Sequence, residues 1–372
     1  DAAIQAYLRE AGLADVIGSS GAPGDGFLIT VTAPPNQTPV FKITRGHFYV
    51  DGIMVINDAD NVPLVDQPYG LLEADLQSLQ PPPLNTAPLP ALPYGGVAGG
   101  QRLRTDLIYL DVWEQHITAI EDNSIREVAL GGPDTATRLQ TRWRVRYRAG
   151  VTAPVGQPVV ADCTDAISNF PPGVTGTGRL TTTDNPGDPT SDPCIVEPDR
   201  GGYRGLENRL YRVEIHVGGS RGAARYKWSS ENGAVVYRVE EVSAAKRLKL
   251  TRDGRDAVLR FSDGQAVEIY SAEDVRLGRS GVLTRIDGKP NDLELVLVDS
   301  IAIYQNTDNV FIRRWDDIAR AVDQGGALGD SGIEVAFSES DYRVGEYWTF
   351  AARARTGSFE IVNDEPPHGI AH

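Results

Sequence analysis

The chain has 372 residues, of which 41% are hydrophobic and 23% charged, as in a soluble globular protein with two or three domains. No apolar run approaches the roughly 18 to 20 residues of a membrane-spanning helix, so we expect no direct membrane insertion. The formal net charge of −15 argues against DNA or RNA binding, which needs clustered Lys and Arg. The alternating Arg142, Arg144, Arg146 and Arg148 are interpreted as a solvated strand face. Because the chain begins at Asp1, it neither indicates nor excludes a signal peptide.

The first 100 residues are predicted to hold a helix, a β-hairpin region and an extended arm. Residues 2–17 place apolar side chains at helical spacing. Short β-like runs follow over residues 27–31, 39–43, 45–50 and 53–56. Asp51-Gly52 between the last two suits a type I′ turn, so these runs predict a hairpin. The Pro-rich residues 57–100 are typical of a linker or an arm lying on a surface.

Residues 101–242 are predicted to form a central antiparallel β domain. Residues 105–113 and 137–148 alternate apolar and polar side chains, and we expect these two strands to pair. A Pro- and Gly-rich stretch without periodicity, residues 151–202, predicts a long loop. Cys163 and Cys194 could close this loop with a disulfide or stay free. Its aspartates match no calcium-loop spacing and are interpreted as turn or solvated residues: Asp162, Asp165, Asp184, Asp188 and Asp192.

The stretch from Tyr203 to Val239 predicts a hairpin at the centre of this domain. Residues 210–215 alternate strictly, which is typical of a half-buried strand. Asn232-Gly233 then predicts a tight turn into a strand over residues 234–239. Four polar residues at the start of the first strand are candidates for a site, but we interpret them as turn and ion-pair residues: Glu207, Asn208, Arg209 and Arg212.

An inserted small β-barrel is predicted over residues 243–302. Its short strands are expected at residues 246–250, 257–261, 266–269, 281–286 and 293–298, separated by Asp-Gly turns. Residues 303–372 add strands at 310–316, 332–337 and 342–355, which complete the central domain, and a polar tail. The predicted fold is therefore mainly β: antiparallel sheets in a sandwich framework with an inserted small barrel, a short N-terminal helix and long Pro/Gly-rich loops.

No motif for nucleophilic, phosphate-binding or zinc chemistry is present, so we assign no catalytic, cofactor or metal-binding residue. His47, His116 and His216 lie in or beside predicted strands and are interpreted as structural. His368 and His372 could share a metal on a helix, but Pro366, Pro367 and Gly369 disfavour a helix there. Asp111 and Glu114 flank Trp113 as a glycan-cleaving pair could, although a structural role is favoured. The five tryptophans, one per strand region, are interpreted as core anchors: Trp113, Trp143, Trp228, Trp315 and Trp348.

Several long motifs, in order along the chain, resemble a family of β-rich proteins encoded with phage tail and contractile injection system genes. They are YLDVWEQHITAIED (109–122), IREVALGGPDTATRLQTRWRVR (125–146), the loop flanked by Cys163 and Cys194, YRGLENRLYRVEIH (203–216), KWSSENGAVV (227–236), FIRRWD (311–316), YRVGEYWTFAARA (342–354) and DEPPHGIAH (364–372). The resemblance runs from about residue 40 to the end. It weakens before that, so we expect the chain to have been cut or processed there.

The resemblance implies an assembly role in a phage-tail-like particle, at the baseplate, cap or fibre attachment. We therefore expect a non-enzymatic structural subunit that contacts other subunits, self-associates and is assembled in the cytoplasm. A surface glycan-binding or glycan-cleaving β protein is the alternative, and it would require Asp111, Glu114 and a tryptophan to converge in a deep cleft. A third interpretation, an isolated secreted binding module, would require a Cys163–Cys194 disulfide and a monomer.

Overall fold

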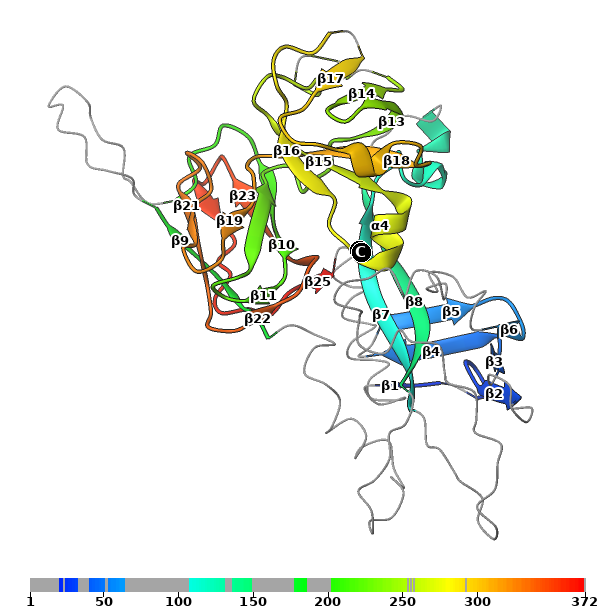
Figure 1. The fold of residues 1–372 in the computed structure, drawn as a ribbon. Helices are drawn as coiled ribbons and strands as arrows, with labels where there is room; N and C mark the ends of the chain where they lie inside the picture. The colour runs from blue at the N-terminus through cyan, green and yellow to red at the C-terminus, as the bar shows by residue number, and fades with distance from the viewer. Residues whose placement is uncertain are drawn as a thin grey trace, which may run out of the picture. The chain divides into compact units, whose positions relative to one another are not determined.

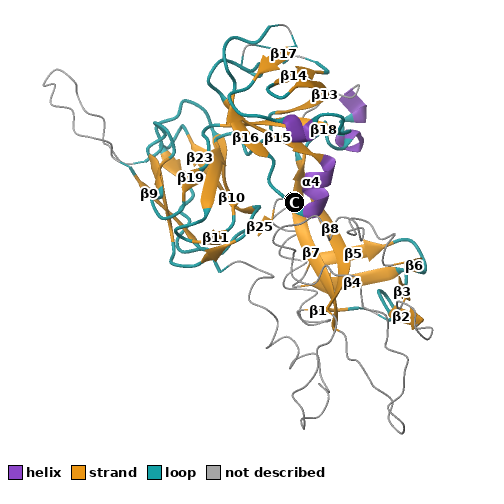
Figure 2. Cartoon of the chain, viewed as in Figure 1, coloured by secondary structure: helices purple, strands orange, loops and turns teal. Residues whose placement is uncertain are grey.

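The computed structural model describes residues 20–22, 24–32, 40–50, 53–63, 107–130, 136–148, 177–185, 202–252, 254, 256, 258–291 and 293–370. These residues are mainly β, in antiparallel sheets with one short α-helix, as predicted (Figures 1 and 2). The chain forms two compact units: unit 1 is residues 1–114 and 140–172, and unit 2 is residues 115–139 and 173–372. No helix in the described part could cross a membrane. The predicted helix at 2–17, residues 64–100 of the arm, Cys163 and Cys194 lie outside the described residues.

The described residues of unit 1 form three small sheets, with strand orders β1-β4-β5, β2-β3-β6 and β7-β8. The bounds are Ser20–Gly21 (β1), Ile29–Thr32 (β2), Val40–Ile43 (β3), Gly46–Val50 (β4), Ile53–Asn57 (β5), Val62–Pro63 (β6), Leu107–Ile117 (β7) and Arg138–Arg148 (β8), with the unit boundary falling within β7 and β8. The predicted hairpin is confirmed, with Val50 opposite Ile53, and so is the pairing of the two long strands. Trp143 anchors the core: its ring packs edge-on against Phe27, and its Nε1 donates to the Ile56 carbonyl at 2.9 Å.

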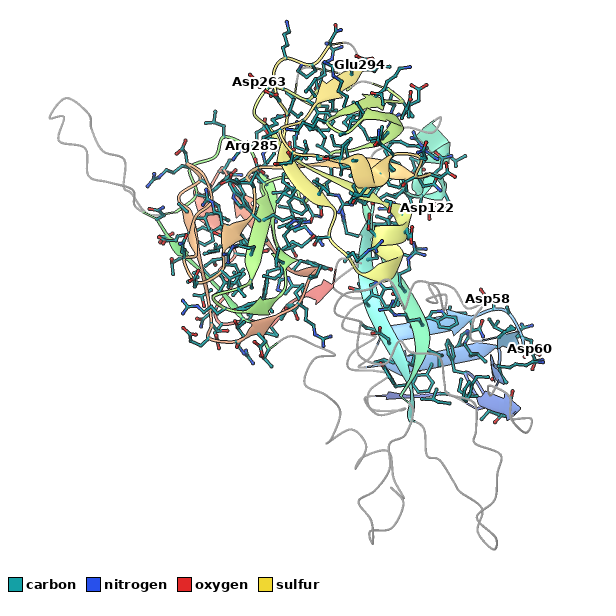
Figure 3. The ribbon with its side chains drawn as sticks, in the orientation of Figure 1. Asp58, Asp60, Asp122, Asp263, Arg285 and Glu294 are labelled. Carbon is teal, nitrogen blue, oxygen red and sulfur yellow. The ribbon has the colours of Figure 1, made fainter. Side chains whose placement is uncertain are left out.

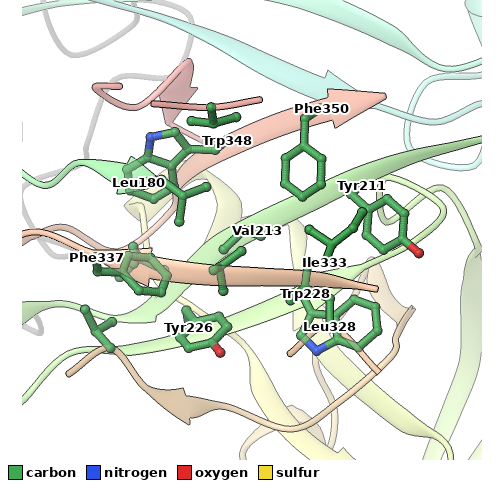
Figure 4. Close-up of a cluster of buried hydrophobic side chains, with 14 of the residues drawn as sticks. Leu180, Tyr211, Val213, Tyr226, Trp228, Leu328, Ile333, Phe337, Trp348 and Phe350 are labelled. Carbon is green, nitrogen blue, oxygen red and sulfur yellow. The ribbon is translucent and has the colours of Figure 1, made fainter. Parts of the chain in front are cut away.

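A sandwich, the first part of unit 2, surrounds an apolar core. One sheet has the order β19-β12-β10-β23-β24 with β25 also paired to β23, another has the order β20-β21-β9, and β11 pairs with β22. Trp348 and Phe350 of the first sheet share this core with Leu180 and Phe337 of the second (Figure 4). The bounds are Leu180–Asp184 (β9), Arg209–Val217 (β10), Gly219–Ser220 (β11), Arg225–Ser229 (β12), Arg320–Ala321 (β19), Gly326–Ala327 (β20), Ile333–Phe337 (β21), Asp341–Tyr342 (β22), Glu346–Arg353 (β23), Ser358–Phe359 (β24) and Gly369–Ile370 (β25).

A six-stranded half-barrel, with the order β16-β15-β18-β13-β14-β17, is the second part of unit 2. Its bounds are Val236–Ala244 (β13), Arg247–Leu250 (β14), Ala266–Ser271 (β15), Val282–Arg285 (β16), Glu294–Val296 (β17) and Val310–Trp315 (β18), so it uses strands on both sides of the predicted insertion. Val267, Ile269 and Ile312 are fully buried in its own apolar core. Charged side chains such as Asp263 and Glu294 are exposed on its outer side (Figure 3).

The turn at Asn232 and Gly233 has the left-handed backbone expected, with φ of 54° and 61°. The hairpin prediction around it is wrong, because the turn carries the chain from β12 of the sandwich to β13 of the half-barrel. In the sandwich, β10 instead lies between β12 and β23. The same local turn geometry thus connects two different sheets.

Two further local predictions need correction. The predicted loop 151–202 contains a strand, β9, whose β-branched Thr181, Thr182 and Thr183 pair with β21. The strand predicted at 257–261 is a turn where described, because the Asp256 carboxylate accepts from the Val258 and Leu259 amides.

The short helix α4, Ala272–Leu277, was not predicted. Ser271 caps it and forms a capping box with Asp274, and Gly278 ends it with a φ of 66°. The spacing of Ser271, Asp274 and Gly278 is the sequence signal that would have revealed it. Two short 3₁₀ turns, Asn123–Ile125 and Val128–Leu130, and a third at Ala302–Tyr304 complete the described helical segments.

Candidate functional site

The polar face of β10 is buried, contrary to the prediction of a half-buried strand. Tyr211, Val213 and Ile215 point into the sandwich core, and the opposite face carries Arg212 and Glu214, only 1% and 4% exposed. Glu214 on this face shares Lys227 of β12 with Glu268 of β15, a strand of the half-barrel. The groups that meet there are called the ionic junction: Glu121, Arg212, Glu214, Lys227, Glu268 and Arg313.

Lys227 of β12 is at the centre of the ionic junction. Its Nζ lies 3.0 Å from Glu214 Oε1 and 2.5 Å from Glu268 Oε2, so one ammonium links a sandwich strand to a half-barrel strand. The same Nζ lies 4.4 Å from the centre of the Trp315 ring, and Trp315 Nε1 donates to Glu268 Oε2 at 2.9 Å. Burial of these charges is tolerated because each is paired and hydrogen-bonded.

Arg212 and Arg313 contribute two further ion pairs to the junction. Arg212 Nε lies 2.7 Å from Glu214 Oε2, and its guanidinium stacks on the Tyr347 ring at 3.8 Å. Arg313 Nη2 lies 2.9 Å from Glu121 Oε1. Tyr270 donates its hydroxyl to the same Glu121 oxygen at 2.8 Å, and the Thr118 amide donates to Glu121 Oε2 at 2.8 Å. The segment after β7 is thereby tied to the half-barrel.

The electrostatics keep the junction carboxylates ionised. Burial alone would raise the pKa of Glu268, but Lys227, His216 and Arg313 together outweigh burial and hold that pKa at about 2. Burial also opposes ionisation of Glu214, yet Lys227 and Arg212 keep its pKa below the usual value. Burial lowers the pKa of His216 to about 4, with a further decrease from Lys227. Burial, followed by Arg212 and Arg313, lowers the pKa of His116 well below its usual value.

A small cavity of about 30 Å³ opens onto the junction, lined among others by Gln115, His116, Glu121, Glu214, Glu268 and Arg313. It has space for about two water molecules, and a sugar ring or nucleotide is far larger. Neither ring nitrogen of His116 has a hydrogen-bond partner among the described residues. In that same part of the chain, no group of three or more His, Cys, Asp or Glu side chains is arranged to hold a metal ion.

The residues considered as a glycan-cleaving pair lie in unit 1. Asp111 forms an ion pair with Arg144, with Oδ2 3.0 Å from Nε. The Arg144 guanidinium lies over the Trp113 ring at 5.0 Å. Glu114 is half-buried at the end of unit 1. Asp111 and Trp113 thus share Arg144 across two strands, a contact that stabilises the β7-β8 pair.

The other residues singled out in the sequence are scattered. His47 is exposed on β4, His116 and His216 lie at the junction, and His368 Nδ1 accepts from the Thr349 amide at 3.1 Å. Asp184 is exposed at the end of β9, whereas the other four loop aspartates and His372 lie outside the described residues.

The four polar residues at the start of β10 make structural contacts. Arg209 forms ion pairs with Glu207 at 2.8 Å and Glu231 at 2.9 Å. Asn208 Oδ1 accepts from the Ala354 amide at 3.0 Å. Arg212 belongs to the ionic junction described above. These contacts agree with the interpretation of the four residues as turn and ion-pair residues.

Sequence reasoning missed Lys227, Glu268 and Arg313 as partners. A signal was present, since Glu268 lies between Val267 and Ile269 in a strand whose six residues are all buried. A charged residue in such a strand needs a buried partner. The partner itself could not be read from the sequence, because Lys227 is 41 residues away.

A model of a family of unknown function, DUF6519, matches residues 1–168 and 174–368. The chain belongs to this family. The match includes the first 40 residues. No curated protein matches the chain. No solved structure matches it either.

Proposed function

We propose that the chain is a non-enzymatic structural subunit of a contractile phage-tail-like particle, acting through protein–protein assembly at a baseplate, cap or fibre-attachment position. The sequence motifs described above carry the resemblance on which the particle assignment depends. The structure supports the non-enzymatic part of the proposal through the way in which it uses the residues of these motifs.

The observation that carries the proposal is that the motif residues are used for internal packing. From YRGLENRLYRVEIH, Tyr211 and Val213 lie in the sandwich core and Glu214 in the ionic junction. Lys227 of KWSSENGAVV and Arg313 of FIRRWD complete that junction. The cavity beside them is too small for a substrate of ordinary size. Long motifs that build a framework rather than a substrate cleft fit a protein that works through its outer surface.

Among the described residues, several apolar motif side chains are exposed, Val128 and Leu206 most of all. Leu206, in the segment before β10, is 96% exposed, and a side chain so exposed contributes little to the stability of its own chain. We place it in a subunit contact of the particle, where burial of a leucine against another chain would be favourable.

The test is sedimentation of particles from the source cells, followed by negative-stain microscopy and mass spectrometry of the particle fraction. We expect the chain to be recovered with sheath and tube proteins. Recovery only as a free monomer, in cells whose particles sediment normally, would refute the proposal.

Two surface variants sharpen this experiment. Leu206→Asp is expected to lower incorporation into particles without changing the melting temperature of the purified chain. Val258→Asp is the matched control, because Val258 is 67% exposed and lies outside the motifs. Equal incorporation of the two variants would exclude Leu206 from the contact.

A further inference from the structure

The ionic junction has its hydrogen-bond acceptors filled. Both carboxylate oxygens of Glu121, Glu214 and Glu268 lie within hydrogen-bonding distance of at least one donor. The donors are Arg212, Lys227, Tyr270, Arg313, Trp315 and the amides of Thr118 and Gly281. A further hydrogen-bond donor entering this region would therefore find few free acceptor positions on these carboxylates.

Several buried nitrogens, by contrast, are left over: two arginine donors, and the two ring nitrogens of His116, of which one is a donor and one an acceptor while the ring is neutral. Arg313 Nε, Arg212 Nη2 and both ring nitrogens of His116 are buried without a hydrogen-bond partner among the described residues. Of these residues, His116 and Arg313 line the cavity directly. Buried donors without an acceptor are costly, so the site calls for an occupant that accepts hydrogen bonds.

The formal charges of the junction are balanced without such an occupant. Arg212, Lys227 and Arg313 offset the three glutamates, and Arg279, which also lines the cavity, pairs with Asp274 at 3.0 Å. An added anion would leave one uncompensated negative charge. His116 is the group able to offset it, because a protonated imidazole carries one positive charge and two N–H donors.

We propose that this cavity binds a small monovalent anion of halide size, held by Arg313 Nε and the His116 ring, together with a proton on His116. The cavity volume of about 30 Å³ excludes larger organic anions. Arg313 comes from the half-barrel and His116 from the end of β7, so the bound ion would strengthen the packing between these elements. The inference does not depend on the proposed assembly function.

The dependence on pH follows from the groups that surround His116. Burial opposes its protonation most, followed by Arg212 and Arg313, while Glu214 favours it. The remaining charged and titratable groups lining the cavity are Glu121, Lys227, Glu268, Tyr270 and Arg279. An anion beside His116 adds a favourable interaction with the protonated ring. Anion binding and proton uptake are therefore linked, and halide should bind more tightly as the pH falls.

The test compares thermal unfolding of the full chain in sodium chloride, sodium bromide and sodium gluconate at equal ionic strength. Above the dissociation constant, each tenfold rise in halide should raise the folding equilibrium constant about tenfold, with no such rise in gluconate. The effect should be larger at acidic than at neutral pH. His116→Phe removes both ring nitrogens and should abolish it, whereas His47→Phe, at an exposed histidine of β4, should preserve it.

Anomalous diffraction from a crystal soaked in bromide provides a second measurement that needs no variant. A bromide peak between Arg313 and His116 is expected. Equal melting temperatures in halide and gluconate would overturn the proposal, and so would a halide effect that persists in the His116→Phe chain. If that variant does not fold, a cavity without bromide would overturn it in the same way.

Discussion

Lys227 of β12 and Glu268 of β15 meet in the buried junction of unit 2, with Nζ 2.5 Å from Oε2. Their contact joins the sandwich to the half-barrel, two sheets with separate apolar cores. A buried ion pair adds little net stability compared with an apolar pair of the same shape, but removal of one partner leaves an uncompensated buried charge. The junction therefore specifies how the two sheets pack, and disruption of a single partner should be costly.

Replacement of Lys227 by Met should lower the free energy of unfolding by about 3 to 5 kcal/mol, because Glu214 and Glu268 both lose their shared cation. Urea denaturation of the full chain measures this change. The matched control is Lys249→Met, whose exposed ion pair with Glu240 at 2.9 Å should contribute very little. Similar losses in the two variants would contradict this account of the junction.

A double variant tests the coupling between the same partners. Lys227→Met combined with Glu268→Gln should cost less than the sum of the two single losses, by about 0.5 to 3 kcal/mol. The physical reason is that the second substitution removes the charge that the first left unpaired. Simple additivity would mean that Lys227 and Glu268 do not interact in solution.

On acidification, unit 2 should begin to lose stability at a higher pH than carboxylate titration alone predicts. Burial lowers the pKa of His216 from 6.5 to about 4, so between these pH values the unfolded chain binds a proton that the folded chain does not. Stability therefore falls as the pH drops through this window, by roughly 3 kcal/mol for His216, and His116 acts in the same direction. Glu268, whose pKa is held at about 2, adds a further loss below 4.5.

Melting temperatures of the full chain across this pH range measure the effect. His216→Gln should flatten the dependence between pH 6.5 and 4, and the control His47→Gln should leave it as in the parent chain. An unchanged slope in the His216→Gln chain would show that His216 is not buried in solution.

The Trp315 indole should stabilise the fold through the hydrogen bond of its nitrogen as well as through its buried apolar surface. Trp315 is 2% exposed, and its Nε1 donates to Glu268 Oε2 at 2.9 Å. Trp315→Phe should cost more than the loss of apolar volume explains, by about 1 to 3 kcal/mol, because the carboxylate loses one buried donor. Trp143→Phe, which removes a donor to the neutral carbonyl of Ile56, is the comparison and should show a smaller excess.

Helix α4 should depend on its cap. Ser271→Ala removes the hydroxyl that accepts from the Asp274 amide and donates to its carboxylate, and should cost about 1 kcal/mol. Denaturant titration measures the loss. Ser262→Ala serves as the control, since the side chain of Ser262 has no part in a helix cap. Equal effects at both positions would show that the capping box contributes nothing.

The local sequence pattern was sufficient to predict many of the strands. The alternation in residues 105–113 and 137–148 predicted two long strands and their pairing, and the Asp-Gly signal predicted the β4-β5 hairpin. Failures occurred where side chains compete with the backbone, as at Asp256, or where a strand lies within a loop-like composition, as at Thr181 to Thr183. The candidate site was predicted only in part. The sequence singled out Arg212 and the histidines, but it did not predict that charged residues from distant strands meet in a buried junction.

The alternation of residues 210–215 determined, from sequence alone, that β10 has one apolar and one polar face. That period belongs to the extended backbone and needs no distant partner. Only the tertiary structure decided that the polar face is buried, because the residues that pair with it and cover it come from distant parts of the sequence. Lys227 meets Glu268 over 41 residues, and Glu121 meets Arg313 over 192. A polar side chain specifies that it needs either water or a partner, and the packing of distant strands determines which one it receives.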